Sequence, residues 1–192
     1  MNQQFSEDII TDQFASGAII NTDHEGFPKD YLVLWCLLKK YKNILKTFVE
    51  IGTHQGTGTK IIKSAVGAEC IVYSMDLPYE LGYLSWNYTD RIGINCNLPF
   101  IQLRADSTKF DFCSIYPIDG WYIDGGHAYE NVFIESQEAI KSNAKLIVWH
   151  DADIDGVYKA IIDAFQDNGD YDLFRVQDTR IAYALRKKIK LQ

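Results

Sequence analysis

The sequence contains no apolar run long enough to span a membrane, and its first residues lack the basic, apolar pattern of a signal peptide. Positive charge is scarce as well, because 19 lysines and arginines stand against 26 aspartates and glutamates, a net charge of −7. A duplex nucleic-acid partner requires a basic face. We therefore expect a cytoplasmic protein with neither a membrane nor a nucleic acid as partner, and its oligomeric state, a homo-oligomer included, stays open.

Cysteine is also scarce. The four cysteines, Cys36, Cys70, Cys96 and Cys113, lie far apart and form no C-x-x-C pair. They therefore indicate reduced thiols rather than a disulfide framework or a zinc site. The remaining composition, 47% hydrophobic and 14% aromatic over 192 residues, is typical of a globular domain with a full core.

The stretch 47–58 combines a short apolar strand with a glycine-rich turn. Phe48, Val49 and Ile51 are strand formers, and the glycines that follow can adopt positive φ angles and let a ligand approach the backbone. A helix that opens at about Thr59 would direct backbone N–H groups toward an anionic or polar ligand group.

The glycine spacing distinguishes between nucleotide-binding motifs. Gly52, Gly56 and Gly58 fit neither the dinucleotide motif G-x-G-x-x-G nor the P-loop motif G-x-x-x-x-G-K-[ST]. Together with Glu50 they resemble E-x-G-x-x-x-G, the first motif of the class I methyltransferases that use S-adenosylmethionine. For this stretch alone, an ordinary strand–turn–helix without a ligand is the alternative.

Apolar runs alternate with helical segments along the chain. Such alternation favours parallel βαβ units, and a turn at 178–180 between two short final strands predicts a hairpin. We expect an α/β Rossmann-like methyltransferase fold, with a mostly parallel seven-stranded sheet, a C-terminal antiparallel hairpin and helices on both faces. The first predicted strand lies at the start of the stretch 47–58, and the others are 70–76, 100–106, 120–124, 145–151, 173–177 and 181–186. The predicted helices begin near Pro28, Thr59, Tyr129 and Gly156.

The sequence predicts one domain over residues 1–192, with a polar leader at 1–25. The region 77–98 is long for a connection in this architecture and carries four aromatic residues, Tyr79, Tyr83, Trp86 and Tyr88. Long loops inside compact domains are usually functional or conceal a missed element. We expect an extra helix or a lid over a substrate cleft, and a plain insertion is the alternative.

An acidic residue lies at or near the end of every predicted parallel strand. Ligands of such sheets bind beyond the carboxyl ends of the strands. The acidic residues therefore predict a polar site at that edge, formed from Glu50, Asp76, Asp106, Asp124 and Asp151.

Two further motifs follow the fourth and fifth predicted strands. Residues 122–130 read Y-I-D-G-G-H-A-Y-E, and residues 147–153 read I-V-W-H-D-A-D. With the glycine motif and Asp76, they resemble a methyltransferase family whose pattern is I-D-G-x-H-x-Y-E, a helix, V-x-H-D and a G-V-x-x-A helix, over residues 48–165. The chain also resembles the metal-dependent sugar O-methyltransferases. This resemblance implies methyl transfer from S-adenosylmethionine to a hydroxyl of a sugar or another polyol-like small molecule.

The resemblance also implies a metal site and a base. Its relatives hold a divalent ion with the strand-four Asp and an acidic pair after strand five, which implies Asp124, His150 and Asp151 as ligands here. Because His150 replaces an acidic residue, manganese would suit the site better than magnesium; alternatively, His150 only orients Asp151 or binds substrate. Gly126 stands where some relatives carry a second Asp, so the resemblance implies His127 as the general base, working beside Asp124.

The resemblance further implies a cofactor site along the glycine turn and the strand ends. Glu50 and His54 would lie near the methionine part, Asp76 would bind the ribose hydroxyls and Asp106 would contact the adenine amino group. Two other functions remain open: a metal-assisted hydrolase that uses Asp124, His127, His150 and Asp151, and a non-catalytic module that binds an adenosyl ligand. The implied cofactor-binding residues are Glu50, Gly52, Thr53, His54, Gly56, Thr57, Asp76, Asp106, Ser107 and Asp124.

Overall fold

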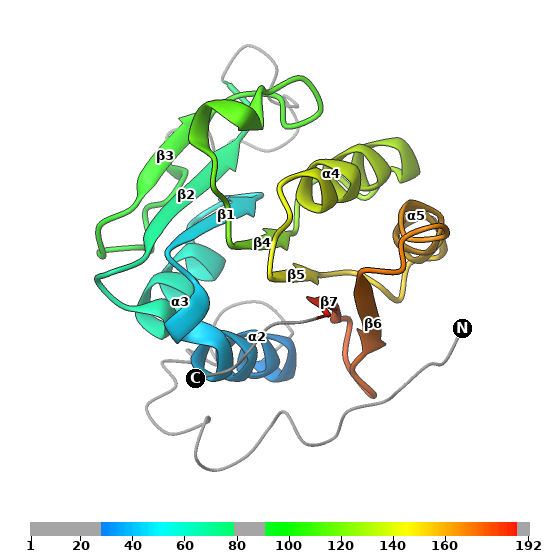
Figure 1. Cartoon of the computed structure of the whole chain (residues 1–192). Helices are drawn as coiled ribbons and strands as arrows, with labels where there is room; N and C mark the ends of the chain where they lie inside the picture. The colour runs from blue at the N-terminus through cyan, green and yellow to red at the C-terminus, as the bar shows by residue number, and fades with distance from the viewer. Residues whose placement is uncertain (1–27, 79–90, 188–192) are drawn as a thin grey trace.

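The computed structural model describes residues 28–78 and 91–187 of the chain. The leader at 1–25 and most of the predicted lid at 77–98 lie outside these residues. The described part forms one sheet of seven strands with helices on both faces (Figure 1). Its strands are β1 (Thr47–Ile51), β2 (Ile71–Asp76), β3 (Ile101–Arg104), β4 (Gly120–Ile123), β5 (Leu146–Trp149), β6 (Tyr171–Arg175) and β7 (Ala182–Arg186).

The strand order is β3-β2-β1-β4-β5-β7-β6. The first five strands pair in parallel, and β7 runs antiparallel to both of its neighbours, β5 and β6. This arrangement confirms the predicted Rossmann-like methyltransferase fold with a C-terminal hairpin. The strand order reverses direction at β1 and β4, which is the point where ligands bind to open α/β sheets.

Among the described residues, four long helices cover the sheet. They are α2 (Pro28–Tyr41), α3 (Thr57–Val66), α4 (Tyr129–Lys141) and α5 (Asp155–Ala164). In Figure 1, α2 and α3 lie on one side of the sheet and α4 and α5 on the other. Short 3₁₀ turns at Lys42–Ile44 and Phe112–Ile115 connect the longer elements.

Alternate strand residues separate the core into two layers. Phe48 of β1 packs in the cluster that contains α2 and α3, whereas its neighbour Val49 packs in the cluster that contains α4 and α5. The same alternation holds for Tyr122 and Trp121 on β4. A strand buried on both faces reads as a continuous apolar run, as the parallel strands here do.

The largest differences from the predicted boundaries lie in the hairpin and at helix starts. Strand β6 begins at Tyr171, where it pairs with Arg186, rather than at 173. Helix α3 begins at Thr57, two residues before the predicted start. Strands β3, β4 and β5 end at Arg104, Ile123 and Trp149, one or two residues before the predicted ends, so Asp106, Asp124 and Asp151 lie in the loops that follow.

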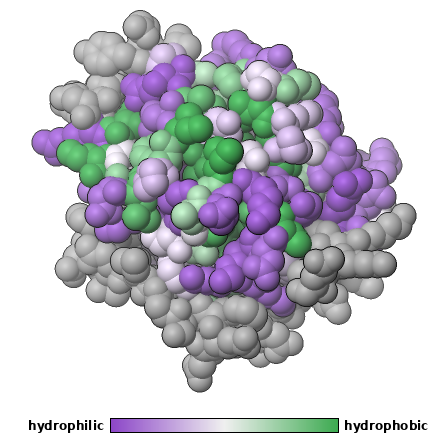
Figure 2. Space-filling view, turned by 60° about the vertical axis from the view of Figure 1, so that its left-hand side comes forward, coloured by the Kyte–Doolittle hydropathy of each residue, from purple (hydrophilic) through white to green (hydrophobic). Residues whose placement is uncertain are grey.

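The sheet edge formed by β3 carries some exposed apolar area. Ile71 at the start of β2 and Ile101 at the start of β3 are 49% and 44% exposed. Figure 2 brings this side of the molecule forward and shows hydrophobic residues among hydrophilic ones.

Within residues 28–78 and 91–187, no helix is long and apolar enough to cross a membrane.

Candidate active site

The polar residues that the sequence singles out gather at one edge of the sheet. Asp76 is the last residue of β2, Asp124 directly follows β4, and Asp151 lies two residues beyond β5. Because these strands are parallel, their carboxyl ends face the same way. The position of this cluster agrees with the prediction from the sequence.

The glycine turn connects β1 to α3 and touches the end of β4. Gly52 has a φ of +97°, and a Cβ atom on it would lie 2.1 Å from the carbonyl oxygen of Asp124. Only glycine allows this close approach. Helix α3 then begins after Gly56, and no side chain caps its first turn. The N–H groups of this turn are therefore suited to a polar ligand group.

Residues just before β3 pack against this turn. The N–H of Gly93 donates to the carbonyl of His54 at 2.9 Å, and the N–H of Asn95 donates to the carbonyl of Gln55 at 2.8 Å. The end of the predicted lid region thus contacts the candidate cofactor turn, whereas residues 79–90 lie outside the described residues.

Glu50 lies beneath the glycine turn and is fully buried. Its Oε2 accepts hydrogen bonds of 2.5 Å from the hydroxyls of Thr59 and Ser74. Burial raises the pKa of Glu50 to about 8. A Cβ atom on Gly58 would lie 2.5 Å from Glu50 Oε1, so helix α3 packs directly on this carboxyl. In this arrangement Glu50 supports the turn from below.

Thr53 joins the same buried hydrogen-bond network. Its hydroxyl lies 2.6 Å from that of Ser74 and accepts a hydrogen bond of 2.9 Å from the amide of Gln102 on β3. The network links β1, β2 and β3 under the turn. It fixes Thr53 in place and leaves the next residue, His54, at the surface.

Asp76 accepts two backbone hydrogen bonds. Its Oδ2 accepts from the N–H of His54 at 2.7 Å, and its Oδ1 accepts from the N–H of Leu77 at 2.8 Å. His54 has a positive φ of 45°, which an ordinary residue adopts only where its surroundings hold it. Asp76 therefore fixes the shape of the turn above it.

Asp106 and Ser107 occupy the loop after β3. Asp106 accepts hydrogen bonds from the N–H and hydroxyl of Thr108 and pairs with Lys109 at 2.7 Å. The contact with the Lys109 ammonium lowers the pKa of Asp106, and the hydrogen bonds from Thr108 lower it further. Ser107 donates a 2.5 Å hydrogen bond to Glu135 of α4, a buried side chain whose pKa burial raises to about 7. The loop is thereby tied to α4.

His150 lies among three carboxylates. Its Nε2 is 3.1 Å from Asp30, and its Nδ1 is 3.2 Å from Asp124 and 3.1 Å from Asp151. Burial by itself lowers the pKa of the ring, but the hydrogen bonds to Asp124, Asp151 and Asp30 outweigh it and raise the pKa to about 11. His150 is therefore an imidazolium with both ring nitrogens facing carboxylates.

His127 lies on the open side of Asp151. The Nε2 of His127 is 2.5 Å from Asp151 Oδ2, and the His127 side chain is 54% exposed, against 5% for Asp151. The hydrogen bond to Asp151 raises the pKa of His127. Burial works to raise the pKa of Asp151, but His127 and His150 hold it well below its usual range. An exposed imidazole oriented by a buried carboxylate can accept a proton from a bound ligand.

The donor set for a metal differs from the predicted one. Ligand atoms of Asp124, His127 and Asp151 all lie within 4.8 Å of one another. His150, predicted as a ligand, instead directs both ring nitrogens at carboxylates. Among the described residues, the cluster whose ligand atoms lie together thus contains His127 and not His150, which stays a predicted ligand.

Two residues of the site have no counterpart in the sequence prediction. Asp30 of α2 is 3% exposed and pairs with His150. Arg180, in the turn between β6 and β7, pairs with Asp151 and Asp153. A charged residue at the start of an otherwise apolar helix was the one sequence signal for Asp30, and nothing near Arg180 distinguishes it from an ordinary turn residue.

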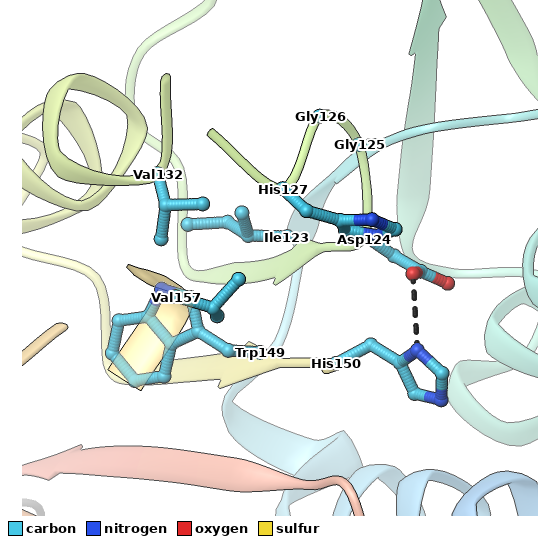
Figure 3. A pocket seen from close by; sticks show the side chains of 9 residues that line it. All are labelled: Ile123, Asp124, Gly125, Gly126, His127, Val132, Trp149, His150 and Val157. Atoms are coloured by element: carbon cyan, nitrogen blue, oxygen red, sulfur yellow. Dashed lines mark ion pairs between the residues drawn. The ribbon is translucent and has the colours of Figure 1, made fainter. Parts of the chain in front are cut away.

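A pocket lies between β4, β5, α4 and α5 at the same edge of the sheet (Figure 3). It has an empty volume of about 200 Å³, open solvent at its mouth included. One side is polar, with Asp124, His127 and His150, and Figure 3 shows the Asp124–His150 ion pair at this side. The other side is largely apolar, lined by Ile123, Val132, Trp149 and Val157.

No family model matches the chain, and no curated protein matches it. Solved structures do match its fold. The cofactor-bound Rv0187 from MTB is similar with a TM-score of 0.59 and 17% identity, over 92% of this chain and 88% of that one. An O-methyltransferase from Bacillus cereus in complex with SAH is similar with a TM-score of 0.54 and 13% identity, over 91% and 88% of the two chains.

A third similar structure is the methyltransferase MycE of the mycinamycin biosynthetic pathway, in complex with Mg and SAH. It matches with a TM-score of 0.58 and 15% identity, over 88% of this chain but 53% of that one, so the present chain spans about half of MycE. At these identities the similarity establishes the fold, which this chain shares with structures of methyltransferases.

Proposed function

We propose that the protein is an S-adenosylmethionine-dependent methyltransferase that methylates a hydroxyl oxygen of a sugar or another polyol-like small molecule. The observation that carries the proposal is the His127–Asp151 pair, which lies beside Asp124 at the switch point of a methyltransferase fold. The similar structures that contain SAH support the choice of cofactor.

S-adenosylmethionine would supply an electrophilic methyl group. The protein must then hold the acceptor hydroxyl in line with that group and remove its proton. In our proposal His127 donates its Nε2–H to Asp151 and accepts the proton of the hydroxyl at its other ring nitrogen, Nδ1, and Asp151 stabilises the imidazolium that results. The apolar wall of the pocket, which includes Val132 and Val157, would exclude water from the methyl group.

The glycine turn would hold the cofactor. In this proposal, the open N–H groups at the start of α3, with the backbone of Gly52, Gly56 and Thr57, receive the methionine part. Asp76 binds the ribose hydroxyls, and Asp106 with Ser107 lines the adenine pocket.

The four cysteines are free, which supports the expectation of a reducing, cytoplasmic environment.

A divalent cation would be held by Asp124, His127 and Asp151, whose donor types suit manganese better than magnesium. Such an ion would lower the pKa of a bound hydroxyl. The same cluster also favours the second candidate, a metal-assisted hydrolase. The two functions differ in their need for the adenosyl cofactor.

Calorimetry with S-adenosylmethionine and SAH tests the proposal first. We expect wild type to bind both compounds. Asp76→Ala should bind them more weakly by about 1–3 kcal/mol, because the ribose hydroxyls, buried in the complex, would lose their hydrogen-bond acceptor. Asp167→Ala, at an exposed position in the loop after α5, is the matched control. Transfer of a labelled methyl group to hydroxylated acceptors then tests turnover. A protein that binds neither compound, or that hydrolyses an ester without them, would exclude the methyltransferase.

A further inference from the structure

Arg180 is fixed at several points although it lies in a surface turn. Its carbonyl accepts a 2.9 Å hydrogen bond from the N–H of Ala152, and its own N–H donates to Asp30 Oδ1 at 3.2 Å. Its Nε donates to Asp153 at 3.0 Å, and its Nη2 contacts Asp151 Oδ1. The side chain is only 23% exposed. The turn thus presents this guanidinium to the site in one position.

Both carboxylate oxygens of Asp151 face cationic or protonatable groups. His127 Nε2 is 2.5 Å from Oδ2. Arg180 and His150 both approach Oδ1, His150 at 3.1 Å. Asp151 is 5% exposed, so these charges interact with little screening by water. A divalent cation on Oδ1 would have to displace the guanidinium or lie against it.

The wider cluster is partly neutralised in the same way. Its carboxylates are Asp30, Asp124, Asp151 and Asp153, and the two cations among them are His150 and Arg180. A metal site of three ligands ordinarily carries an excess of negative charge that the ion neutralises. Here the residues of the chain already supply part of that neutralisation, and Arg180 supplies it at Oδ1 of Asp151.

We propose that Arg180 is the resident counter-charge of Asp151 and excludes a divalent cation from the cluster of Asp124, His127 and Asp151. Asp151 then remains a hydrogen-bond acceptor that orients His127. This inference rests on the proposed function of the same site and decides between its two forms, in favour of proton removal by His127 without a divalent cation. Its experiment measures metal binding alone, so its outcome is independent of whether methyl transfer is found.

The test is a titration with Mn²⁺, in which electron paramagnetic resonance measures the concentration of the free ion and so the amount that is bound. We expect wild type to bind Mn²⁺ weakly and Arg180→Gln to bind it roughly 10- to 100-fold more tightly, because a positive charge next to the ion is removed. Arg180→Lys, which keeps the charge, should bind as weakly as wild type. In the Arg180→Gln background, Asp151→Asn should abolish the gain and so locate the ion.

Arg186→Gln is the matched control. Arg186 is on the same hairpin, but it contacts the carbonyl of Asn143, away from the site. This control should bind Mn²⁺ like wild type. Thermal melting establishes that each variant is folded. The proposal would be overturned if wild type bound Mn²⁺ as tightly as Arg180→Gln does. Tight Mn²⁺ binding by wild type alone would also overturn it, so the test stands even if Arg180→Gln does not fold.

Discussion

The Nε2 atom of His150 lies 3.1 Å from Oδ2 of Asp30, a residue 120 positions earlier in the chain. This contact joins α2 to the loop after β5 and directs the other nitrogen of the ring toward Asp124 and Asp151. The buried pair therefore sets the position of the groups that surround the candidate base. It also holds a positive charge inside the site.

The first prediction concerns Asp30. Removing one partner of a buried ion pair leaves the other charge uncompensated, so Asp30→Ala should lower the free energy of unfolding by about 3 kcal/mol. Urea denaturation of wild type and variant measures the difference. Lys29→Ala is the control, because the pair of Lys29 with Asp178 is 50% and 76% exposed and should contribute little. Equal stability of the two variants would mean that the Asp30–His150 contact contributes nothing.

The second prediction compares two glycines with similar φ angles. Gly52 and Gly67 have φ values of +97° and +85°, but a Cβ atom on Gly52 would meet the Asp124 carbonyl at 2.1 Å, whereas nothing lies within 4 Å of one on Gly67. Gly67→Ala should cost about 1–3 kcal/mol, the strain of a positive φ combined with a ψ of −173°. Gly52→Ala should cost more than this, because its Cβ would also clash with the Asp124 carbonyl, and it should weaken cofactor binding. Denaturation curves that shift equally would show that β4 moves aside without cost.

The fold could be predicted because its signal is local. Each parallel strand is a short apolar run, and α4 begins at Tyr129 as predicted, after a turn with two glycines. The gathering of Asp124, His127 and Asp151 at one edge could also be predicted, since these residues follow strands whose carboxyl ends must meet.

The cationic part of the site could not be predicted in this way. Asp30 and Arg180 are 150 positions apart and approach only because α2 packs near the β6–β7 turn. A charge at a helix start and another in a turn are both usual at the protein surface. The partner of His150 Nε2 likewise lies on a distant helix, so the sequence could not show that both ring nitrogens face carboxylates. The assignment of His150 as a metal ligand stays a prediction.

The third prediction concerns the pH dependence of stability at Glu50. Burial raises its pKa from 4.5 to about 8 in the folded protein, so between these values the unfolded chain has released a proton that the fold still holds. Stability from this group is therefore complete below about pH 4.5 and falls as the pH rises toward 8. The side chain of Glu50→Gln cannot titrate, so the stability of this variant does not decrease with rising pH through this group.

The measurement is the difference in unfolding free energy between wild type and Glu50→Gln at a series of pH values. Subtracting the variant removes the contributions of the histidines and other groups that both proteins share. We expect the advantage of wild type to shrink steadily over this range. A constant difference would show that Glu50 is ionised within the fold, held by the hydroxyls of Thr59 and Ser74.

The last prediction is that His127 is the general base. Loss of a general base typically lowers turnover by about 10²–10⁴-fold, so His127→Ala should reduce methyl transfer by this order and leave cofactor affinity nearly unchanged. The side chain is 54% exposed, and α4 begins after Ala128 without a side-chain cap, so His127 neither packs in the core nor caps the helix. The substitution should therefore leave the melting temperature close to that of wild type.

The control for this variant is Glu130→Ala, an exposed substitution three residues further on. It should keep both turnover and stability. Asp151→Asn should share much of the loss seen in His127→Ala, because it removes the carboxylate that orients the imidazole. The two effects should be far from additive in the double variant, since both act on one proton transfer. If His127→Ala retains full turnover, or loses turnover only in proportion to a fall in stability, another group accepts the proton and Asp124, which accepts a 3.0 Å hydrogen bond from Tyr122, becomes the next residue to test.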